Sequence, residues 1–503
     1  MKMKVEKQFK RTVKAGLILF AAGALLGAVI VYAVTPSSTF YISSGVYPGA
    51  PSFTIWREGS NYFAKDDNGM LKYSGTNATT IIQSVVNNHG RIFFRDGTYE
   101  VKNIILVSNL VMEGESHNTI LKLPNSADNH LLRVDDNVTS ISITSLTLDG
   151  NAGQQVFDDR YCFFSWKKSI KNLTIENVVF TNFKRALQIY SFSSAPSANI
   201  NIKNCRFLAS SASVGMIIMR YIDNCAITGN YIESDGSSVV SSYALYCQGN
   251  NTVIDRNTIN GTGAGICFYA PPTASSSTFY NIISNNNVYN LWSSADGSWA
   301  ILAESGRTIV ENNIVHDCAR DAIVVTQGFG LKGCTVSGNT VYNCGTGATG
   351  VGIWVHGAAG TKVMREIAVT GNTVLNCVGG IVITYANYSS ISGNTIADCV
   401  RHGIFLASSS HCVVDGNTVY GCDSNNTATY HGIFVSPGYY NIISNNICED
   451  NDRYEIYLLN ADYTLVSSCL TTGVDHEEGI IDGGSDNRVV DSYNGTVWIA
   501  SYP

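Results

Sequence analysis

The feature that most constrains the fold is a repeat of 22–33 residues that becomes regular after about residue 140. Its unit reads apolar–x–(Gly or Asn)–Asn–x–apolar, as in ITGNYI at 227–232, VSGNTV at 336–341 and VDGNTV at 414–419. The recurring asparagines are Asn230, Asn257, Asn286, Asn313, Asn339, Asn372, Asn394, Asn417 and Asn446. A sustained period of this length is typical of repeat architectures in which each unit stacks on the next.

Each repeat contains three short apolar segments separated by turns. In the stretch 395–417 they are Thr395–Ala397, Ile404–Leu406 and Cys412–Val414. Helical repeats need a period of 3.6 and leucine-rich repeats a denser leucine pattern, and neither is present. Only 9 of 503 residues are proline while 46 are glycine and 45% are hydrophobic, which agrees with an all-β chain rich in turns. The sequence predicts a single-stranded parallel β-helix with three short strands per coil and about 12–14 coils, stacked about 4.8 Å apart.

Stacking places equivalent residues of successive coils in columns. A stacked asparagine can hydrogen-bond to the asparagines above and below it, so we interpret the asparagine column as structural rather than catalytic. Cysteines form two further columns, Cys318, Cys344, Cys377, Cys399 and Cys422, and Cys225, Cys334 and Cys412. Residues stacked in register are somewhat too far apart for an unstrained disulfide, so we expect a ladder of buried free thiols. Disulfides in an exported protein, or a metal site, are the alternatives.

The first 34 residues differ in composition from the rest. Six basic residues precede Ala15 with one acid, Glu6, among them, and 15–34 is then 20 residues long without a charge, about 30 Å as a helix. A basic flank places the N-terminus inside the cell and the remainder outside. We expect a cytoplasmic segment at 1–14 and a transmembrane signal-anchor helix at 15–34, in a single-pass protein of the cell membrane. A cleaved signal peptide is the alternative, although its apolar region would be shorter.

The remainder of the chain is acidic. The overall charge is −7 and the first 34 residues carry +5, which leaves −12 for the expected ectodomain. A diffuse acidic surface does not favour nucleic acid as a partner. Eight Asn-X-Ser/Thr acceptors are glycosylation candidates in an exported chain: Asn77, Asn137, Asn172, Asn250, Asn260, Asn387, Asn425 and Asn494.

The start of the repeat region has its own pattern. TTIIQSVVNN at 79–88 predicts a short amphipathic helix, and GRIFFRDGTYEV at 90–101 follows it. This order resembles the start of pectate-lyase-like right-handed parallel β-helices, in which a helix caps the first coil and a strand ends in a Gly-Thr-Tyr turn. A cap is needed because an exposed coil end is a sheet edge. The resemblance covers about residues 76–495 and points to no specific enzyme family.

With this resemblance the domain organisation follows. We expect an extracellular stalk or small β module at 35–75, the β-helix with its capping helix at 76–470, and C-terminal coils and a cap at 471–503.

An aromatic row is expected on the outer face of the second strand of each coil. If the isoleucine of that strand points inward, the outward residues include Tyr246, Trp354, Phe405, Phe434 and Tyr457, with Tyr269 and His356 at strand ends. Exposed aromatic rings suit stacking on sugars, and they equally suit a protein interface or burial under a loop such as 270–280. These seven residues are the predicted carbohydrate-binding set.

His402 and His431 on consecutive coils, with Arg401, Tyr430 and Arg453, are the candidates for chemistry. A neutral histidine or tyrosine can abstract a proton while arginine stabilises the developing charge, as β-elimination requires. The motifs of the resembled hydrolases, an aspartate trio, Gly-His-Gly and Arg-Ile-Lys, are not intact here. Two histidines alone form a weak metal site, and no carboxylate pair suited to hydrolysis emerges. Whether the chain is an enzyme stays open.

The leading hypothesis is a membrane-anchored cell-surface β-helix protein that binds polysaccharide or cell-surface partners without a cofactor. One alternative is a polysaccharide lyase, or less readily a glycoside hydrolase, acting on the face around residues 320–456, with Ca²⁺ if it is a lyase. Another is a structural or adhesive oligomer such as a homotrimer.

Overall fold

The computed structural model describes residues 52–88, 90–209, 215–234, 243–269, 280–293, 297–326, 333–345, 350–360, 363–425, 427, 429–472, 479–493 and 498–499. The chain divides into two units, Met1–Pro48 and Gly49–Pro503, and the described residues belong to the second. The predicted cytoplasmic segment and membrane helix lie outside the described residues. Among the residues that are described, no helix has the length and apolar character needed to cross a bilayer.

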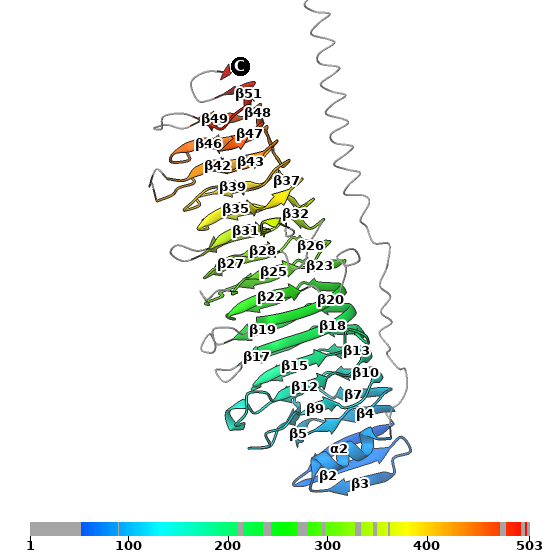
Figure 1. Ribbon diagram of the computed structural model, residues 1–503. Helices are drawn as coiled ribbons and strands as arrows, with labels where there is room; N and C mark the ends of the chain where they lie inside the picture. The colour runs from blue at the N-terminus through cyan, green and yellow to red at the C-terminus, as the bar shows by residue number, and fades with distance from the viewer. Residues whose placement is uncertain are drawn as a thin grey trace, which may run out of the picture. The chain divides into compact units, whose positions relative to one another are not determined.

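The second unit is an all-β solenoid in which each coil contributes one strand to each of three rows, A, B and C. In Figure 1 the strands of successive coils lie one above another from β4 to β51. Neighbouring coils pair in parallel throughout, for example Ile381↔Ile404↔Ile433↔Ile456. The predicted parallel β-helix with three strands per coil is therefore confirmed.

The strands of the three rows have the following bounds. Row A consists of β4 (Gly90–Phe94), β7 (Leu110–Gly114), β10 (Val138–Thr144), β13 (Ile170–Glu176), β16 (Ser197–Lys203), the second halves of β18 (Gly215–Thr228) and β20 (Tyr243–Asp255), β23 (Asn281–Ser284), β26 (Thr308–Glu311), β29 (Thr335–Ser337), β33 (Ala368–Thr370), β37 (Ser390–Ser392), β40 (Val413–Asp415), β44 (Ile442–Ser444), β48 (Leu465–Ser467) and β51 (Arg488–Val490). Row B consists of β5 (Gly97–Glu100), β8 (Thr119–Lys122), β11 (Thr147–Asp149), β14 (Val179–Thr181), β17 (Arg206–Ala209), β19 (Tyr231–Ser234), β21 (Thr258–Asn260), β24 (Asn287–Tyr289), β27 (Ile314–Cys318), β30 (Thr340–Cys344), β34 (Thr373–Leu375), β38 (Thr395–Ala397), β41 (Thr418–Tyr420), β45 (Ile447–Glu449), β49 (Leu470–Thr472) and β52 (Ser492–Tyr493). Row C consists of β6 (Ile104–Ile105), β9 (Leu132–Val134), β12 (Tyr161–Trp166), β15 (Arg185–Tyr190), the first halves of β18 and β20, β22 (Ala264–Tyr269), β25 (Ile301–Glu304), β28 (Ile323–Thr326), β31 (Val351–His356), β35 (Gly379–Thr384), β39 (Ile404–Ala407), β42 (His431–Val435), β46 (Tyr454–Leu459) and β50 (Ile480–Gly483).

A few elements stand outside the three rows. They are the 3-10 turn η1 (Ala152–Gln154), the two-stranded sheets β32 (Met364–Arg365) with β36 (Ala386–Asn387) and β43 (Gly438–Tyr439) with β47 (Ala461–Asp462), and β53 (Trp498–Ile499), which pairs antiparallel with β52.

The N-terminal end of the solenoid is closed by a small β module and a helix. β1 (Phe53–Glu58), β2 (Asn61–Asp66) and β3 (Leu71–Gly75) form an antiparallel meander, and β1 continues row A by pairing in parallel with β4. The helix α2 (Ala78–Val86) starts at the N-cap Asn77, whose side chain accepts from the Thr80 N–H, and it buries its apolar side. Figure 1 shows α2 at this end of the stack, against β2 and β3. The predicted capping helix is confirmed.

The repeat motif is explained by the turn between rows A and B. The residue before each ladder asparagine adopts a left-handed conformation, for example Gly393 and Gly416 with φ near +63° and Asn312 with φ +54°. Glycine and asparagine tolerate this region at the least cost, which is why the motif position holds one or the other in most coils.

The asparagines that follow form one continuous file. The side-chain amide of Asn372 donates to the Oδ1 of Asn394 at 2.9 Å, and Asn394 donates to Asn417 at 2.9 Å. The same bond links each pair from Asn230 to Asn446. Each amide also donates to a backbone carbonyl, so buried polar groups at the turn are satisfied. The structural interpretation of the asparagines is confirmed.

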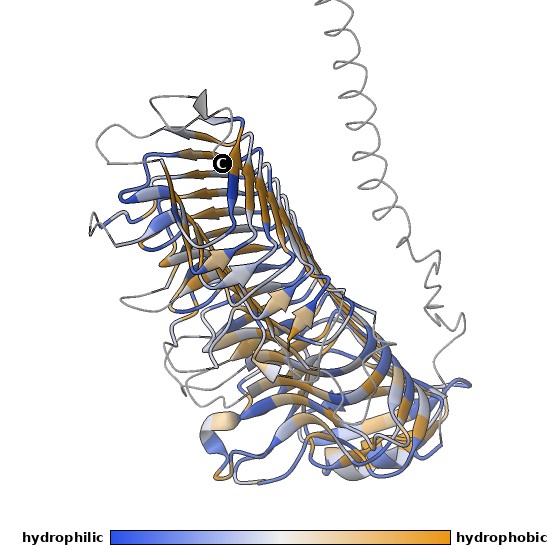
Figure 2. Cartoon of the chain, turned by 45° about the horizontal axis from the view of Figure 1, so that its top comes forward, coloured by the Kyte–Doolittle hydropathy of each residue, from blue (hydrophilic) through white to orange (hydrophobic). Residues whose placement is uncertain are grey.

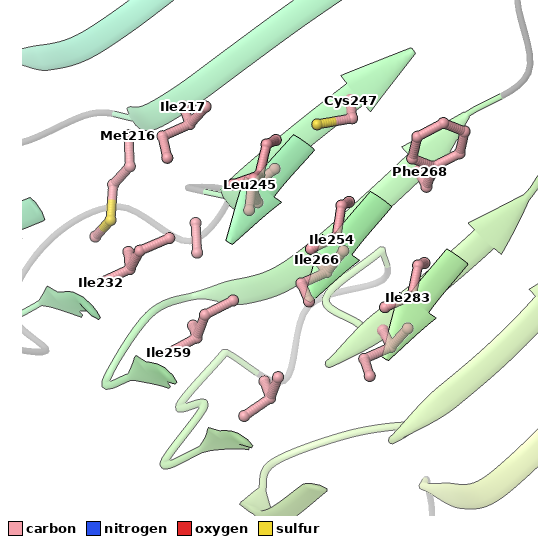
Figure 3. Close-up of a cluster of buried hydrophobic side chains, with 14 of the residues drawn as sticks. Met216, Ile217, Ile232, Leu245, Cys247, Ile254, Ile259, Ile266, Phe268 and Ile283 are labelled. Atoms are coloured by element: carbon pink, nitrogen blue, oxygen red, sulfur yellow. The ribbon is translucent and has the colours of Figure 1, made fainter. Parts of the chain in front are cut away.

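The core runs along the inside of the coils. Figure 3 shows Ile217, Leu245 and Ile266 of row C facing Ile232 and Ile259 of row B and Ile254 and Ile283 of row A. Figure 2 shows the hydrophobic strands repeating along the stack, with the turns more polar. All fourteen cysteines are buried and free. Burial raises the pKa of thiols such as Cys162, Cys247 and Cys267. A hydrogen bond to a neighbouring cysteine, together with burial, raises the pKa of Cys377 and Cys399. The cysteines therefore pack as small hydrophobic side chains, as expected.

Candidate functional site

The outer face of row C carries the residues that the sequence singled out as aromatic. Register places Trp354, Val382, Phe405, Phe434 and Tyr457 side by side on five successive coils. These side chains are half-buried and alternate with fully buried neighbours such as Ile433 and Val435. The outward orientation predicted for this set is therefore found.

Toward the C-terminal end of this face the five residues proposed for chemistry come together in what we call the histidine cluster. The rings of His402 and His431 lie 5.2 Å apart, and Tyr430 packs edge-on against His402 at 5.0 Å. The Arg401 guanidinium lies 5.8 Å from the Tyr430 ring and that of Arg453 lies 5.0 Å from the Tyr454 ring.

Beside the histidine cluster, the rings of Phe405, Phe434 and Tyr457 are stacked along the helix axis. Phe405 and Phe434 are 4.9 Å apart with planes 16° from parallel, and Phe434 and Tyr457 are 5.4 Å apart at 13°. His402 and His431 also contact the ring of Phe434, at 4.7 and 5.1 Å. Because the rings lie face to face, their broad faces are largely covered by one another and mainly their edges remain accessible.

The electrostatics of the two histidines disfavour a role in proton abstraction. Burial lowers the pKa of His402 to about 4, and burial with the neighbouring His402 and Arg453 lowers that of His431 to about 3. The Nδ1 of His402 accepts the His431 backbone N–H at 2.9 Å, so in the neutral ring the proton sits on Nε2. A nitrogen already engaged as an acceptor, with a pKa this low, is a weak general base at neutral pH.

Behind the cluster, Glu455 lies on the inner side of row C. It is 4% exposed and accepts hydrogen bonds from the backbone N–H and the side-chain amide of Asn451. Burial raises its pKa to about 7, despite the two hydrogen bonds that favour the ionised form. In the coil before it the same position is Gly432, as the pairing of His431 with Tyr454 and Ile433 with Ile456 requires.

The middle of the face is apolar and covered. Cys267, Leu302 and Val324 point outward from row C, yet they are at most 2% exposed, and Trp299 and Trp354 pack against them. Trp354 stacks on His356 at 4.2 Å. This patch separates the predicted carbohydrate-binding residues into two groups, with Trp354 and His356 nearer the histidine cluster and Tyr246 and Tyr269 nearer the N-terminal coils.

The N-terminal group belongs to a longer chain of side-chain contacts, which we call the basic–aromatic stack. It consists of Trp166, Tyr190, Arg220 and Tyr269, which share one column, and of Tyr246 from the neighbouring column. Trp166 stacks on Tyr190 at 4.5 Å, and the Arg220 guanidinium lies 5.9 Å from the Tyr190 ring and 4.7 Å from the Tyr246 ring. Tyr246 then stacks on Tyr269 at 4.9 Å.

The first member of this stack faces a hollow. Trp166 is 48% exposed, and among the described residues Tyr190 is its one aromatic stacking partner. In the preceding coil its neighbour by register is Asp135, because Val134 pairs with Ser165. A hollow of about 380 Å³ opens here. Its lining residues are Arg133, Val134, Asp135, Phe164, Trp166 and Lys168.

The hollow combines a flat aromatic surface with charge. The Nε of Arg133 is hydrogen-bonded to Asp135, and the Nζ of Lys168 lies 3.8 Å from Asp136. The ammonium of Lys167 lies 5.8 Å from the Trp166 ring. At the base, His130 stacks on Phe164 at 3.8 Å, and burial, together with Arg160 and Arg133, lowers its pKa to about 4. The arrangement suits a polar ring that carries groups able to accept hydrogen bonds.

The family described as "Right handed beta helix region" matches residues 195–374, 352–428 and 379–494, more than half of the chain. The chain belongs to the right-handed β-helix family. The resemblance found in the sequence is thus confirmed at the level of the fold. No curated protein sequence matches the chain significantly.

Solved structures share the right-handed β-helix fold at low sequence identity. The tailspike protein of E. coli bacteriophage HK620, in complex with a pentasaccharide, matches with a TM-score of 0.53 and 15% identity over 84% of this chain and 79% of that chain. A mutant of the same tailspike gives a TM-score of 0.55 at 15% identity over 84% and 78%. The A-module of the mannuronan C-5 epimerase AlgE6 from Azotobacter vinelandii matches with a TM-score of 0.38 and 12% identity, over 85% of this chain and 96% of that chain.

The β-helix places the glycosylation candidates unevenly. Asn77, Asn137, Asn172 and Asn425 are exposed, whereas Asn250, Asn260 and Asn387 are half-buried. Asn494 lies outside the described residues. No group of three or more His, Cys, Asp or Glu side chains positioned to hold a metal ion occurs in the part of the chain that the structure describes.

The sequence reasoning missed the hollow of this β-helix. Arg133, Phe164, Trp166 and Lys168 precede the regular asparagine repeats, so the repeat does not give their register. The run WKK at 166–168, one coil before Tyr190, was the available signal.

Proposed function

We propose that this β-helix is a glycan-binding protein of the cell surface, held at the membrane by residues 15–34, and that it receives a polysaccharide at the N-terminal hollow of row C. The observation that carries the proposal is the half-exposed indole of Trp166 at the end of the basic–aromatic stack, beside a hollow of about 380 Å³. A sugar ring can lie on that indole, because a flat, partly exposed aromatic ring offers apolar contact while polar groups around it take the hydroxyls.

Two considerations support this location over the histidine cluster, and a third supports glycan binding by this fold. The rings of Phe405, Phe434 and Tyr457 beside that cluster cover one another, whereas Trp166 has one aromatic stacking partner among the described residues. The hollow is bordered by donors and acceptors that fix orientation, namely Arg133, Asp135 and Lys168. The HK620 tailspike, which shares the fold, is solved in complex with a pentasaccharide, and this agrees with a β-helix as a platform for a glycan.

The test is binding of the full chain, kept in mild detergent, to a panel of neutral and acidic polysaccharides. Trp166→Ala is expected to weaken binding of the positive glycan roughly tenfold, since an aromatic stacking contact contributes about 0.5–1.5 kcal/mol beyond its buried area. Tyr420→Ala, which removes a 39% exposed aromatic ring from row B, is the matched control and is expected to bind as the wild type does. Failure of the whole panel, or equal loss in both variants, would contradict the proposal.

A further inference from the structure

The two cations that line the hollow, Arg133 and Lys168, each have one acidic partner and keep further donors for a ligand. Arg133 uses its Nε for Asp135, and no other side-chain partner of its guanidinium occurs among the described residues. The planar group is thereby held in place with its two terminal NH₂ groups available. Such a fork binds a carboxylate through two parallel hydrogen bonds.

Lys168 supplies a second cation on the coil after Arg133. Its one acidic neighbour in the described structure is Asp136, at 3.8 Å, the outer limit of an ion pair, and the Asp136 side chain is 93% exposed. An exposed pair at this distance contributes little, so the ammonium can turn to a ligand at small cost. Lys167 beside the Trp166 ring adds a third positive charge at the rim.

This concentration of basic side chains contrasts with the rest of the ectodomain. The chain outside its first 34 residues carries a net charge of −12. Three basic side chains, Arg133, Lys167 and Lys168, stand here against two acidic ones, Asp135 and Asp136, which leaves a net charge of +1. On an otherwise acidic surface this favours an anion at the hollow over other places.

We propose that the hollow selects a sugar unit bearing a carboxylate, with the ring on Trp166 and the carboxylate on Arg133 and Lys168. This inference rests on the proposed glycan-binding function and adds the ligand class to it. A neutral sugar gains the stacking contact and hydrogen bonds to its hydroxyls, whereas an acidic sugar also gains charge-assisted hydrogen bonds, which are roughly twice as strong as neutral ones.

The experiment compares two probes by calorimetry with the full chain at low salt: oligogalacturonate, whose carboxylates are free, and its methyl ester, whose carboxylates are capped and neutral. Oligogalacturonate is expected to bind at least about tenfold tighter. The double variant Arg133→Gln/Lys168→Gln is expected to lose that preference while still binding the ester. Trp166→Ala is expected to weaken both probes by a similar factor.

The control variant Arg206→Gln/Arg488→Gln removes the same charge from exposed positions on rows B and A, and is expected to keep the preference. Dextran sulfate distinguishes carboxylate recognition from attraction to any polyanion, and binding of it as tight as oligogalacturonate would overturn the inference. Equal affinity for acid and ester would also overturn it, while glycan binding through Trp166 would stand. Binding of neither probe, with a negative polysaccharide panel, would remove the proposed function itself.

Discussion

One buried carboxylate interrupts the inner side of row C. Most coils place glycine or alanine at this position, as at Gly380, Gly403 and Gly432, because the backbone of the next coil is close. A Cβ added to Gly380 would lie 2.1 Å from the Gly403 carbonyl oxygen. Glu455 occupies the position where the next row C strand, β50, is only partly buried, and it carries a pKa raised to about 7 from its ordinary 4.5.

The raised pKa of Glu455 predicts a pH-dependent stability. Below pH 4.5 the carboxyl is protonated in both the folded and the unfolded state, so its burial does not lower the free energy of unfolding. Between pH 4.5 and 7 the unfolded chain ionises first, so stability falls as pH rises, by about 3 kcal/mol in total. We expect Glu455→Gln to gain stability relative to the wild type between pH 5 and pH 8, measured by urea denaturation at each pH.

The comparison of variant with wild type cancels other titrating groups. It matters here because the low pKa values of His402 and His431 act in the opposite direction, removing stability as pH falls below about 6.5. A flat difference for Glu455→Gln would show that the carboxylate is not buried as described.

At the scale of the element, the turn between rows A and B depends on the asparagine file. Asn372 donates to Asn394 and to the Val336 carbonyl, and it accepts from the backbone and side-chain amides of Asn339. We expect Asn372→Ala to destabilise the fold by about 3 kcal/mol or more, because several buried partners lose their hydrogen bonds. Thermal and urea unfolding measure the loss. Asn425→Ala, an exposed asparagine, is expected to change stability by less than about 0.5 kcal/mol.

The elements were largely predictable from the sequence and the site was not. The asparagine motif marks one turn per coil, and the apolar segments beside it give the three strands, as Thr395–Ala397 (β38) shows. The third predicted strand, Cys412–Val414, is displaced by one residue, to Val413–Asp415, since the Cys412 N–H bonds the Asn441 side chain instead of a strand partner.

The environment of each ring could not be predicted from the sequence. The sequence predicts His402 and His431 on consecutive coils, and the structure confirms this, with their rings 5.2 Å apart. Their low pKa values depend first on burial among Phe405, Phe434 and Tyr457. The exposure of Trp166 depends on its neighbour by register in the preceding coil. The varying coil length hides that register in the sequence.

At the scale of the whole molecule, the thiols report on the integrity of the solenoid. All fourteen are buried, and five stand in one column from Cys318 to Cys422. We expect a thiol reagent to modify few or none of them in the native protein and all fourteen after denaturation without reductant, counted by mass spectrometry. Alkylation of fewer than fourteen after denaturation would indicate disulfides and would contradict the free-thiol ladder.

The uneven length of the repeat has a consequence for how such a protein can change. Spacings between ladder asparagines range from 22 to 33 residues, yet every pair from Asn230 to Asn446 keeps the same amide bond. Additional residues are therefore accommodated in the connections between strands, outside the hydrogen-bonded lattice. Insertions there can reshape the rim above row C without disturbing the register below it, so the ligand-facing surface is free to diversify while the scaffold stays constant.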